Sequence, residues 1–507
     1  MFRFVPTRGV VLVGLLLLLP SLLFAAGEVE IATAEAEVFE MGLSGNPDTL
    51  DPHATSGTLT FQVIRSVYDT LIEPDRDGRI VGALAESWEV SANNLVWTFR
   101  LREGVTFHNG DTFTSADVKA TLDRLRAEAT ASPKASEFAA IESIETPGDY
   151  TVVLRLSEPY APLLASLASG WGAILPKSLI DSGHDFANEP VGTGPFVFQE
   201  WIKDNRIVYG ANPDYWMDGR PSIGGVVFNI IPEPAVQVQG LLTEQLDGID
   251  SVGDQNLALL ESDPGTKVET MISSLVMVLA MNTEREPLND LRVRQGIAHA
   301  IDKQSALDVA YGGGVPVSTF MDYTDPYYVD MPDPYPYDPA EARAALDASS
   351  YDGQQLVLAL PQNYEAHVRA GEIYHEMLTQ VGLDVENRLV AWSTWISDVY
   401  RGRNYDLTVI GHTGKLDPDG RLGGYGTGEG YVAYSNDRVA ELFDEAQRVV
   451  DFEARRELYT EGLSIMAREI PHVYVGTSYR RIGLRGEVTG FHMDAKLDTF
   501  DFRYVEM

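Results

Sequence analysis

The chain has 507 residues, of which 44% are hydrophobic and 10% aromatic, and its formal net charge is −37 at pH 7. This length is too great for one hydrophobic core and predicts two or three domains. The strong negative charge repels nucleic acid phosphates and anionic lipid surfaces, so we expect neither as a partner. Because the chain contains no cysteine, disulfides, thiolate metal sites and a lipid-modified cysteine are all excluded.

The first 26 residues have the composition of a secretory signal peptide. Two arginines form a basic start, an apolar run extends from 10 to 24, and small residues follow at 25–27. The run is shorter than the ~20 residues that a membrane-spanning helix needs. We therefore expect export to a bacterial periplasm as a free protein without a lipid anchor. The cleavage point is either directly after the apolar run or near Ala34-Glu35-Ala36.

Alternating apolar residues predict half-buried strands over 97–101 and 150–156. Between them, Thr114-Ser115-Ala116-Asp117 offers a capping box at the start of a helix. Strands and a helix in this order indicate a compact α+β unit over residues 81–185.

Helical patterns become more frequent later in the chain. Apolar residues between 439 and 450 follow the spacing of a helix that packs on a core. Asp338-Pro339 predicts another helix start, because proline is tolerated at the first helical position. Before it, the stretch 322–337 is rich in Pro, Tyr and Asp and predicts a long ordered loop that covers or binds something. Mixed strands and helices over this length indicate α/β or α+β lobes.

Motifs of catalysis and of metal binding are largely missing from the sequence. It has no Walker A loop, no His-Glu-x-x-His and no Gly-x-Ser-x-Gly. The stretch IGHTGKLDPDG at 410–420 superficially resembles a calcium loop, but Leu422 and Gly428 stand where that loop needs glycine and glutamate. The 75 acidic residues allow many carboxylate pairs, so a secreted glycoside hydrolase is the rival hypothesis.

Three adjacent stretches closely resemble the signature of the family 5 extracellular solute-binding proteins. They are LAESWEV (84–90), WTFRLREGVTFHNG (97–110) and FTSADV (113–118). Further matching motifs at 46–53, 191–196, 212–216 and 282–303 extend the resemblance over nearly the whole mature chain. Members of this family are the peptide, nickel-chelate and oligosaccharide receptors of ABC importers.

The resemblance implies an α/β fold, a two-lobed periplasmic binding protein clamshell (type II, class C) with an extra α+β subdomain inserted in the first lobe. Lobe 1 would consist of 37–80, 186–272 and 478–507, the inserted subdomain of 81–185, and lobe 2 of 273–477. It also implies a monomer that captures a ligand between the lobes and delivers it to an ABC-transporter permease. Such a receptor needs no catalysis, no cofactor and no metal.

For the ligand, the resemblance implies peptides first, and oligosaccharides or other hydroxylated or anionic solutes second. The family's peptide receptors hold the ligand's amino group on an aspartate, because a buried ammonium needs an anionic partner. In the stretch Gly411-His412-Thr413-Gly414-Lys415 of this chain, Lys415 stands at that position. Either Lys415 faces the cleft and selects an anionic or hydroxyl-rich ligand, or it extends to solvent and Asp417 replaces the aspartate.

Further contacts are carried over from the family at other positions. Trp392 matches a tryptophan that lines the pocket, whereas core packing is the alternative for Trp395. In lobe 1, Ser56 stands where some peptide receptors use an acidic residue, which weakens the assignment to free peptides. The predicted ligand-binding residues are Thr55, Ser56, Gly57, Trp392, Trp395, His412, Thr413, Lys415 and Asp417.

Overall fold

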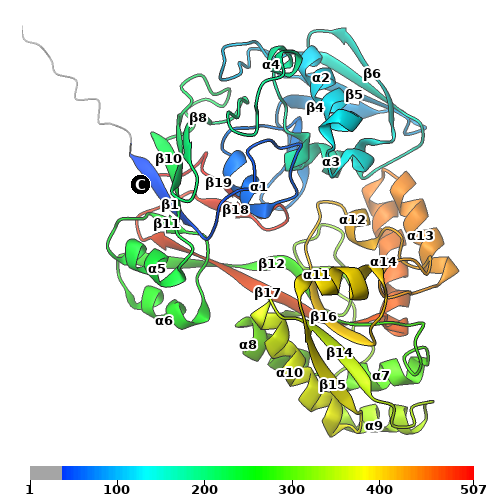
Figure 1. Ribbon diagram of the computed structural model, residues 1–507. Coiled ribbons are helices and arrows are strands. Elements are labelled where there is room, and N and C mark those ends of the chain that lie inside the picture. Colours follow the sequence, from blue (N-terminus) through cyan, green and yellow to red (C-terminus); the bar gives the residue numbers. More distant parts are fainter. Residues whose placement is uncertain (1–36) are drawn as a thin grey trace, which may run out of the picture. The chain divides into compact units, whose positions relative to one another are not determined.

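The computed structural model describes residues 37–507, so the predicted signal segment at 1–26 lies outside the described part of the chain. Within that part, strands and helices form one large mixed sheet, a separate four-stranded sheet and smaller hairpins (Figure 1). No helix between residues 37 and 507 is both long enough and apolar enough to cross a lipid bilayer.

The large sheet draws its strands from widely separated parts of the sequence. They are β1 (Val38–Leu43), β8 (Phe196–Ile202), β9 (Arg206–Ala211), β10 (Gly225–Ile230), β11 (Gly248–Ile249), β12 (Thr266–Met281), β13 (Gly314–Pro316), β14 (Leu356–Pro361), β15 (Val385–Val390), β16 (Leu407–His412) and β17 (His472–Arg485). Their pairing order is β15-β14-β16-β12-β17-β11-β1-β10-β9-β8, and β13 pairs with β17. We call the part with β1 and β8–β11 the first lobe, and the part with β13–β16 the second lobe.

Two long antiparallel strands, β12 and β17, connect the lobes. One end of β17 pairs with β11 of the first lobe, and the far end of β12 pairs with β16 of the second lobe. Figure 1 shows both strands running from one lobe to the other. Their mutual pairing is interrupted between Ile272 and Val276. Such a bulge leaves residues outside the ladder and bends the strand, so the connection changes direction at this point.

The core of the first lobe is rich in aromatic rings. Phe39 of β1 and Phe228 of β10 both pack on Phe502, with ring centroids 5.2 and 5.6 Å apart. This packing fixes the C-terminal hairpin of β18 (His492–Asp494) and β19 (Thr499–Asp501) to the lobe. The other elements of the first lobe are α1 (Thr58–Ile64), β2 (Ile72–Pro74), β3 (Ile80–Gly82), α5 (Pro234–Leu242) and α6 (Asp254–Ser262).

The four-stranded sheet lies within the residues predicted for the inserted subdomain. Its strands β4 (Ala85–Val90), β5 (Val96–Leu101), β6 (Ile141–Gly148) and β7 (Thr151–Leu156) pair in the order β4-β5-β7-β6. The predicted strands are confirmed, with Trp97 and Phe99 fully buried. The capping box is also confirmed, because the N–H and the hydroxyl of Thr114 both donate to the Asp117 carboxylate. The helices are α2 (Ser115–Arg126), α3 (Leu163–Ala168) and α4 (Lys177–Ser182).

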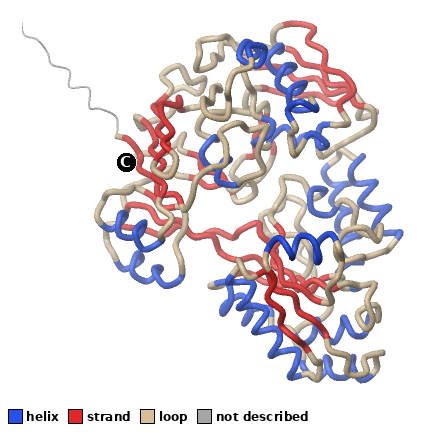
Figure 2. The backbone as a smooth tube through the Cα atoms, viewed as in Figure 1, coloured by secondary structure: helices blue, strands red, loops and turns tan. Residues whose placement is uncertain are grey.

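In the second lobe, alternate residues of β12 enter two different cores. Met277 and Leu279 belong to one core, and Val276 and Val278 belong to the other. A strand that is buried on both faces needs helices on both sides, and Figure 2 shows helices around these strands. The helices are α7 (Leu291–Ala300), α8 (Lys303–Tyr311), α9 (Pro339–Asp347), α10 (Glu365–Gln380), α11 (Trp392–Thr394), α12 (Asp419–Leu422), α13 (Asp437–Arg448) and α14 (Phe452–Glu469), with a π-helical turn at Trp395–Arg401.

Three local predictions fall in the second lobe. The helix start at Pro339 is confirmed, with Asp338 as its cap. The helix expected between 439 and 450 is confirmed as α13, but it ends before Val449, whose backbone is extended. The stretch 322–337 contains no helix or strand, as expected of a loop. The exact boundaries between lobes and subdomain stay a prediction.

Candidate ligand-binding site

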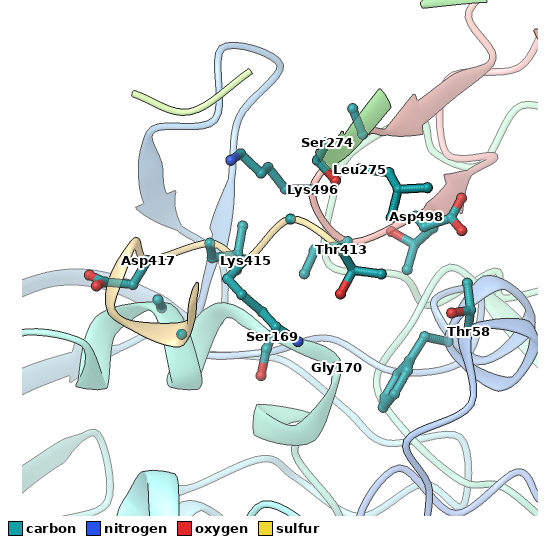
Figure 3. Close-up of a pocket in the computed structure, with 18 of the residues that line it drawn as sticks. Thr58, Ser169, Gly170, Ser274, Leu275, Thr413, Lys415, Asp417, Lys496 and Asp498 are labelled. Atoms are coloured by element: carbon teal, nitrogen blue, oxygen red, sulfur yellow. The ribbon is translucent and has the colours of Figure 1, made fainter. Parts of the chain in front are cut away.

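A cavity of about 580 Å³ is lined by residues of both lobes, and we call it the main cavity. Its walls come from α1, residues 134–137 and 160–171, the bulge of β12, the segment after β16, β17 and the C-terminal hairpin. The lining residues fall in 56–61, 134–137, 160–171, 271–275, 413–420, 478–480 and 493–499. Figure 3 shows part of this lining. Ligand pockets span roughly 300–1,000 Å³, so the main cavity has room for a small solute.

The segment 413–420, which joins β16 to α12, brings most of the predicted second-lobe residues to the main cavity. Thr413, Lys415 and Asp417 all line it. The segment passes close to the bulge of β12, because a Cβ added at Gly414 would clash with the side chain of Ser274. Glycine, which has no side chain, permits this close approach to Ser274.

Lys415 is partly buried, and its ammonium group forms no ion pair or hydrogen bond with any residue between 37 and 507. Figure 3 shows its side chain extending toward Ser169 and Gly170, which directly follow α3. Burial lowers the pKa of Lys415, and the positive charge of Lys134 lowers it further. This placement agrees with the interpretation in which Lys415 faces the ligand, although contact with a ligand stays a prediction.

Asp417 is bound by Arg455 of α14. The two Nη atoms of Arg455 donate to the two carboxylate oxygens at 2.7 and 2.9 Å, and the Arg455 side chain is only 3% exposed. The charge of Asp417 is therefore already balanced inside the protein, and the geometry does not favour its use as the ligand's amine partner. Arg455 also donates to the hydroxyl of Tyr327 at 2.9 Å, which anchors the loop 322–337.

Asp419, two residues further on, is a carboxylate that the sequence interpretation missed. It lines the main cavity at the start of α12 and accepts a hydrogen bond from the amide of Gln447 at 2.7 Å. No cationic side chain in the described part of the chain pairs with it. Burial and then the charge of Asp417 raise the pKa of Asp419 to about 6. The sequence signal that could have identified Asp419 is its place directly after Pro418, in the first turn of a helix.

Lys496 is a second lysine that the sequence interpretation missed, and it comes from the turn of the C-terminal hairpin. Its ammonium group pairs with Asp322 and Asp325 at 3.0 and 2.8 Å, and all three side chains are at most 4% exposed. Asp322 also pairs with Arg421 of α12 at 3.2 Å. The network joins the hairpin of the first lobe to the loop 322–337 of the second. Nothing in the local sequence around position 496 indicates partners so far away in the chain.

Of the three residues predicted in the first lobe, only Ser56 lines the main cavity. The hydroxyl of Thr55 donates to Asp48 at 2.8 Å, and its carbonyl accepts from the indole of Trp171 at 2.8 Å. The N–H of Gly57 donates to the Thr55 hydroxyl at 2.8 Å. Thr55 and Gly57 therefore shape the turn that presents Ser56, and their predicted ligand contacts stay untested.

A second cavity of about 350 Å³ adjoins the main cavity, because Thr413, Lys415 and Gly420 line both. We call it the side cavity. Its other walls include aromatic and cationic side chains, namely Tyr400, His412, Arg421, Tyr425 and Tyr431. His412, which was predicted as a ligand contact, has its Nε2 2.8 Å from the Tyr431 hydroxyl. Burial lowers the pKa of His412 to about 3, so the ring is neutral at pH 7.

The two predicted tryptophans line neither the main cavity nor the side cavity. Trp395 is 3% exposed, and its indole N–H donates to the Thr408 hydroxyl at 2.9 Å. Trp395 therefore packs in the core, which was the alternative to a ligand contact for this residue. Trp392 stacks on Trp395 with ring centroids 5.0 Å apart and remains 37% exposed. Its ligand contact stays a prediction that this geometry does not support.

The charges around the main cavity divide into two kinds. Most charged side chains in its walls are paired, as in Lys134 with Glu137 and Arg480 with Asp498 at 3.7 Å. Lys415 and Asp419 differ, because neither has an oppositely charged partner among residues 37–507. Unpaired charges that are partly removed from water gain most from a ligand that supplies the opposite charge. The site is thus suited to a ligand with an ammonium group, a carboxylate or both.

Known proteins resemble this chain over most of its length. The di/tripeptide-binding protein 1 of Pseudomonas aeruginosa is 29% identical, with 90% of this chain and 91% of that protein covered. DppA of Helicobacter pylori, solved in complex with the peptide STSA, is 26% identical with a TM-score of 0.75, over 93% of this chain and 98% of that one. AgaA of A. tumefaciens R10, solved with agropinic acid, is 27% identical with a TM-score of 0.75 and the same coverage.

These likenesses confirm the predicted two-lobed fold of periplasmic binding proteins, with mixed sheets and helices. The sequence pattern of the bacterial extracellular solute-binding proteins, family 5 Middle, matches residues 79–431. The chain therefore belongs to family 5 of the bacterial extracellular solute-binding proteins, the receptors that bind solutes for ABC transporters.

Proposed function

We propose that this protein captures short peptides in the bacterial periplasm and delivers them to the membrane permease of an ABC importer. Two relatives support the ligand class, since one is named a di/tripeptide-binding protein and the other was solved with a peptide. Membership in an extracellular solute-binding family supports the location and the role in transport.

One observation carries the proposal, namely the carboxylate of Asp419 in the wall of the main cavity. It is partly buried, it has no cationic partner among the described residues, and its pKa is raised to about 6. A peptide's ammonium group would stabilise the ionised carboxylate by direct pairing and lower its pKa again. Asp419 would thus bind the ligand's ammonium group. In the family's peptide receptors this is done by an aspartate at the position that Lys415 holds in this chain.

The connection between the lobes supports capture by closure. The main cavity is lined by Ser56 and Glu137 on one side and by 413–420 on the other. Between them, the strands that join the lobes are interrupted at the bulge of β12. A ligand that contacts both sides stabilises the closed arrangement by its differential affinity for that state. A permease could then distinguish the occupied receptor from the empty one.

A second candidate is an acidic, hydroxylated solute, and the unpaired ammonium group of Lys415 favours it. AgaA, solved with agropinic acid, is as similar to this chain as the peptide-bound relative. In this case the ligand's anionic group would supply most of the binding energy, and a free ammonium group would not be needed.

A thermal-unfolding screen separates these candidates. The protein is first unfolded in guanidinium and refolded without ligand, which removes any solute carried through purification. It is then heated with trialanine, N-acetyltrialanine, agropinic acid or cellotriose. We expect trialanine to stabilise the protein by about 2.7 kcal/mol at a hundredfold excess over its Kd. N-acetyltrialanine at the same concentration should stabilise the protein clearly less, because it lacks the ammonium group.

Each other outcome has a defined meaning. Stabilisation by agropinic acid alone supports the second candidate, and stabilisation by cellotriose alone contradicts both in favour of an oligosaccharide receptor. Mass spectrometry after long incubation should recover every solute unchanged. Cleavage of cellotriose would instead support the rival hypothesis of a glycoside hydrolase.

A further inference from the structure

We infer that the side cavity is a carboxylate subsite, in which Lys415 and Arg421 together bind an anionic group of the ligand. The inference rests on the proposed function, because the side cavity adjoins the main cavity and shares Thr413, Lys415 and Gly420 with it. It goes further by assigning a second recognition point and the chemical class of group that occupies it.

The first observation is that the buried guanidinium group of Arg421 is only partly hydrogen-bonded. Its side chain is only 5% exposed. One Nη atom donates to the carbonyl of Ser274 at 2.8 Å, and the other donates to Asp322 at 3.2 Å. The Nε–H is buried as well, but it has no acceptor among residues 37–507. A buried donor of a charged group is costly when it lacks an acceptor, so Arg421, which lines the side cavity, gains from an oxygen that a ligand brings to it.

The charge balance around the side cavity is the second observation. Asp322 and Asp325 are matched by Lys496 and Arg421, so this network is neutral as a whole. Lys415 therefore adds a positive charge without compensation from this network. Glu429 also lines the side cavity, but it is exposed to solvent, which screens its charge. A carboxylate can accept from Lys415 with one oxygen and from Arg421 with the other.

The aromatic walls are the third observation. The hydroxyl of Tyr425 lies 2.9 Å from Nε2 of His472, and that of Tyr431 lies 2.8 Å from Nε2 of His412. Burial lowers the pKa of both histidines, so both are neutral and add no competing charge. Because these hydroxyls already have partners, the tyrosines offer mainly ring surface. The subsite thus combines two cationic donors with apolar walls for the carbon chain that bears the carboxylate.

Three peptides test this inference by titration calorimetry at pH 7. They are trialanine, its C-terminal amide, and the C-terminal amide of alanyl-glutamyl-alanine. Charge-assisted hydrogen bonds predict that a carboxylate raises affinity by about tenfold over the first amide. If the C-terminus occupies the subsite, trialanine alone shows this gain. If an acidic side chain occupies it, the glutamyl peptide amide shows the gain.

The variants Lys415→Gln and Arg421→Gln should remove the gain, so that the carboxylate-bearing peptide binds each variant no more tightly than the trialanine amide binds that same variant. The matched controls Lys119→Gln and Arg448→Gln alter exposed residues of α2 and α13 and should keep the gain. If Arg421→Gln fails to fold, Lys415→Gln decides alone. Equal affinity of the wild type for all three peptides would overturn the inference.

A second probe keeps the test independent of peptide binding. Benzoate and benzamide have the same shape and differ in charge, and both fit a cavity of about 350 Å³. Benzoate, but not benzamide, should raise the melting temperature of the wild type and should lose this effect in Lys415→Gln. Benzoate stabilisation without any peptide binding would refute the proposed function and support the subsite. Equal stabilisation of wild type and variant by benzoate would contradict the subsite.

Discussion

Two lysines line the same cavity in very different surroundings. Lys496 is 4% exposed and lies between two carboxylates of the other lobe. Lys415 is less deeply buried, and its ammonium group has no counterion within the described part of the chain. A buried ammonium that has its partners holds the protein together, whereas one that lacks them gains a partner only from a ligand. The comparison separates the structural charges of the site from the charges available for binding.

The largest expected effect concerns Lys496. Lys496→Met leaves two buried carboxylates, Asp322 and Asp325, without their ammonium partner. We expect the free energy of unfolding to fall by about 3–5 kcal/mol, as measured by urea denaturation. The control Lys119→Met, at an exposed site of α2, should change it by less than about 0.5 kcal/mol. A loss below about 1 kcal/mol for Lys496→Met would mean that the network is not structural.

Asp417 and Asp419, in the segment after β16, differ in the same way as the two lysines, because only Asp417 has an oppositely charged partner among residues 37–507. Asp417→Asn weakens the bidentate pair with Arg455 and should lower the free energy of unfolding by about 2–3 kcal/mol. Asp419→Asn replaces a desolvated carboxylate that has no cation, so stability should be kept or increased. Urea denaturation of both variants at pH 7 checks this, and equal losses would remove the distinction between the two residues.

The next effect is the pH dependence of the free energy of unfolding that Asp419 causes. The pKa of Asp419 is raised in the folded protein from 3.8 to about 6, so the folded state binds more protons than the unfolded state between these values. Ligand-free stability should therefore decrease as the pH rises from about 4 to about 6, by about 1–2 kcal/mol relative to Asp419→Asn. Denaturation curves of both proteins across this range measure the difference. A wild type that instead becomes more stable relative to Asp419→Asn as the pH rises would contradict the assigned sign.

Lys415 should give the smallest effect on stability. Lys415→Gln removes a partly desolvated ammonium group that has no partner, so the ligand-free protein should gain up to about 1 kcal/mol. The same urea experiment measures this change beside Lys496→Met. A loss of more than about 1 kcal/mol would show that Lys415 has a structural partner after all.

Much of the fold could be predicted from the sequence, because its signals are local. The alternation around Trp97, the cap at Thr114 and the proline at 339 each depend on neighbours a few residues away. Motif resemblance then supplied the order of the lobes. The end of α13 was missed, because apolar residues continue beyond it and periodicity does not register the extended backbone at Val449.

The candidate site was less predictable, because its partners are distant in sequence. Whether Asp417 or Asp419 is available to a ligand depends on Arg455, and no local pattern indicates that pairing. Trp392 was assigned by alignment to a pocket position, yet its surroundings are Trp395 and other aromatic rings of the second lobe. Lys415 stands out in the sequence because it replaces an expected aspartate, but only the structure shows that it has no counterion among residues 37–507.

The central claim is that the main cavity recognises a free ammonium group at Asp419. Titration calorimetry of the refolded, ligand-free wild type with trialanine and N-acetyltrialanine at pH 7 tests it most directly, with Asp419→Asn as the matched variant. We predict that acetylation weakens binding to the wild type by about tenfold or more and has little effect on binding to Asp419→Asn. Equal binding of both peptides to the wild type would contradict the account.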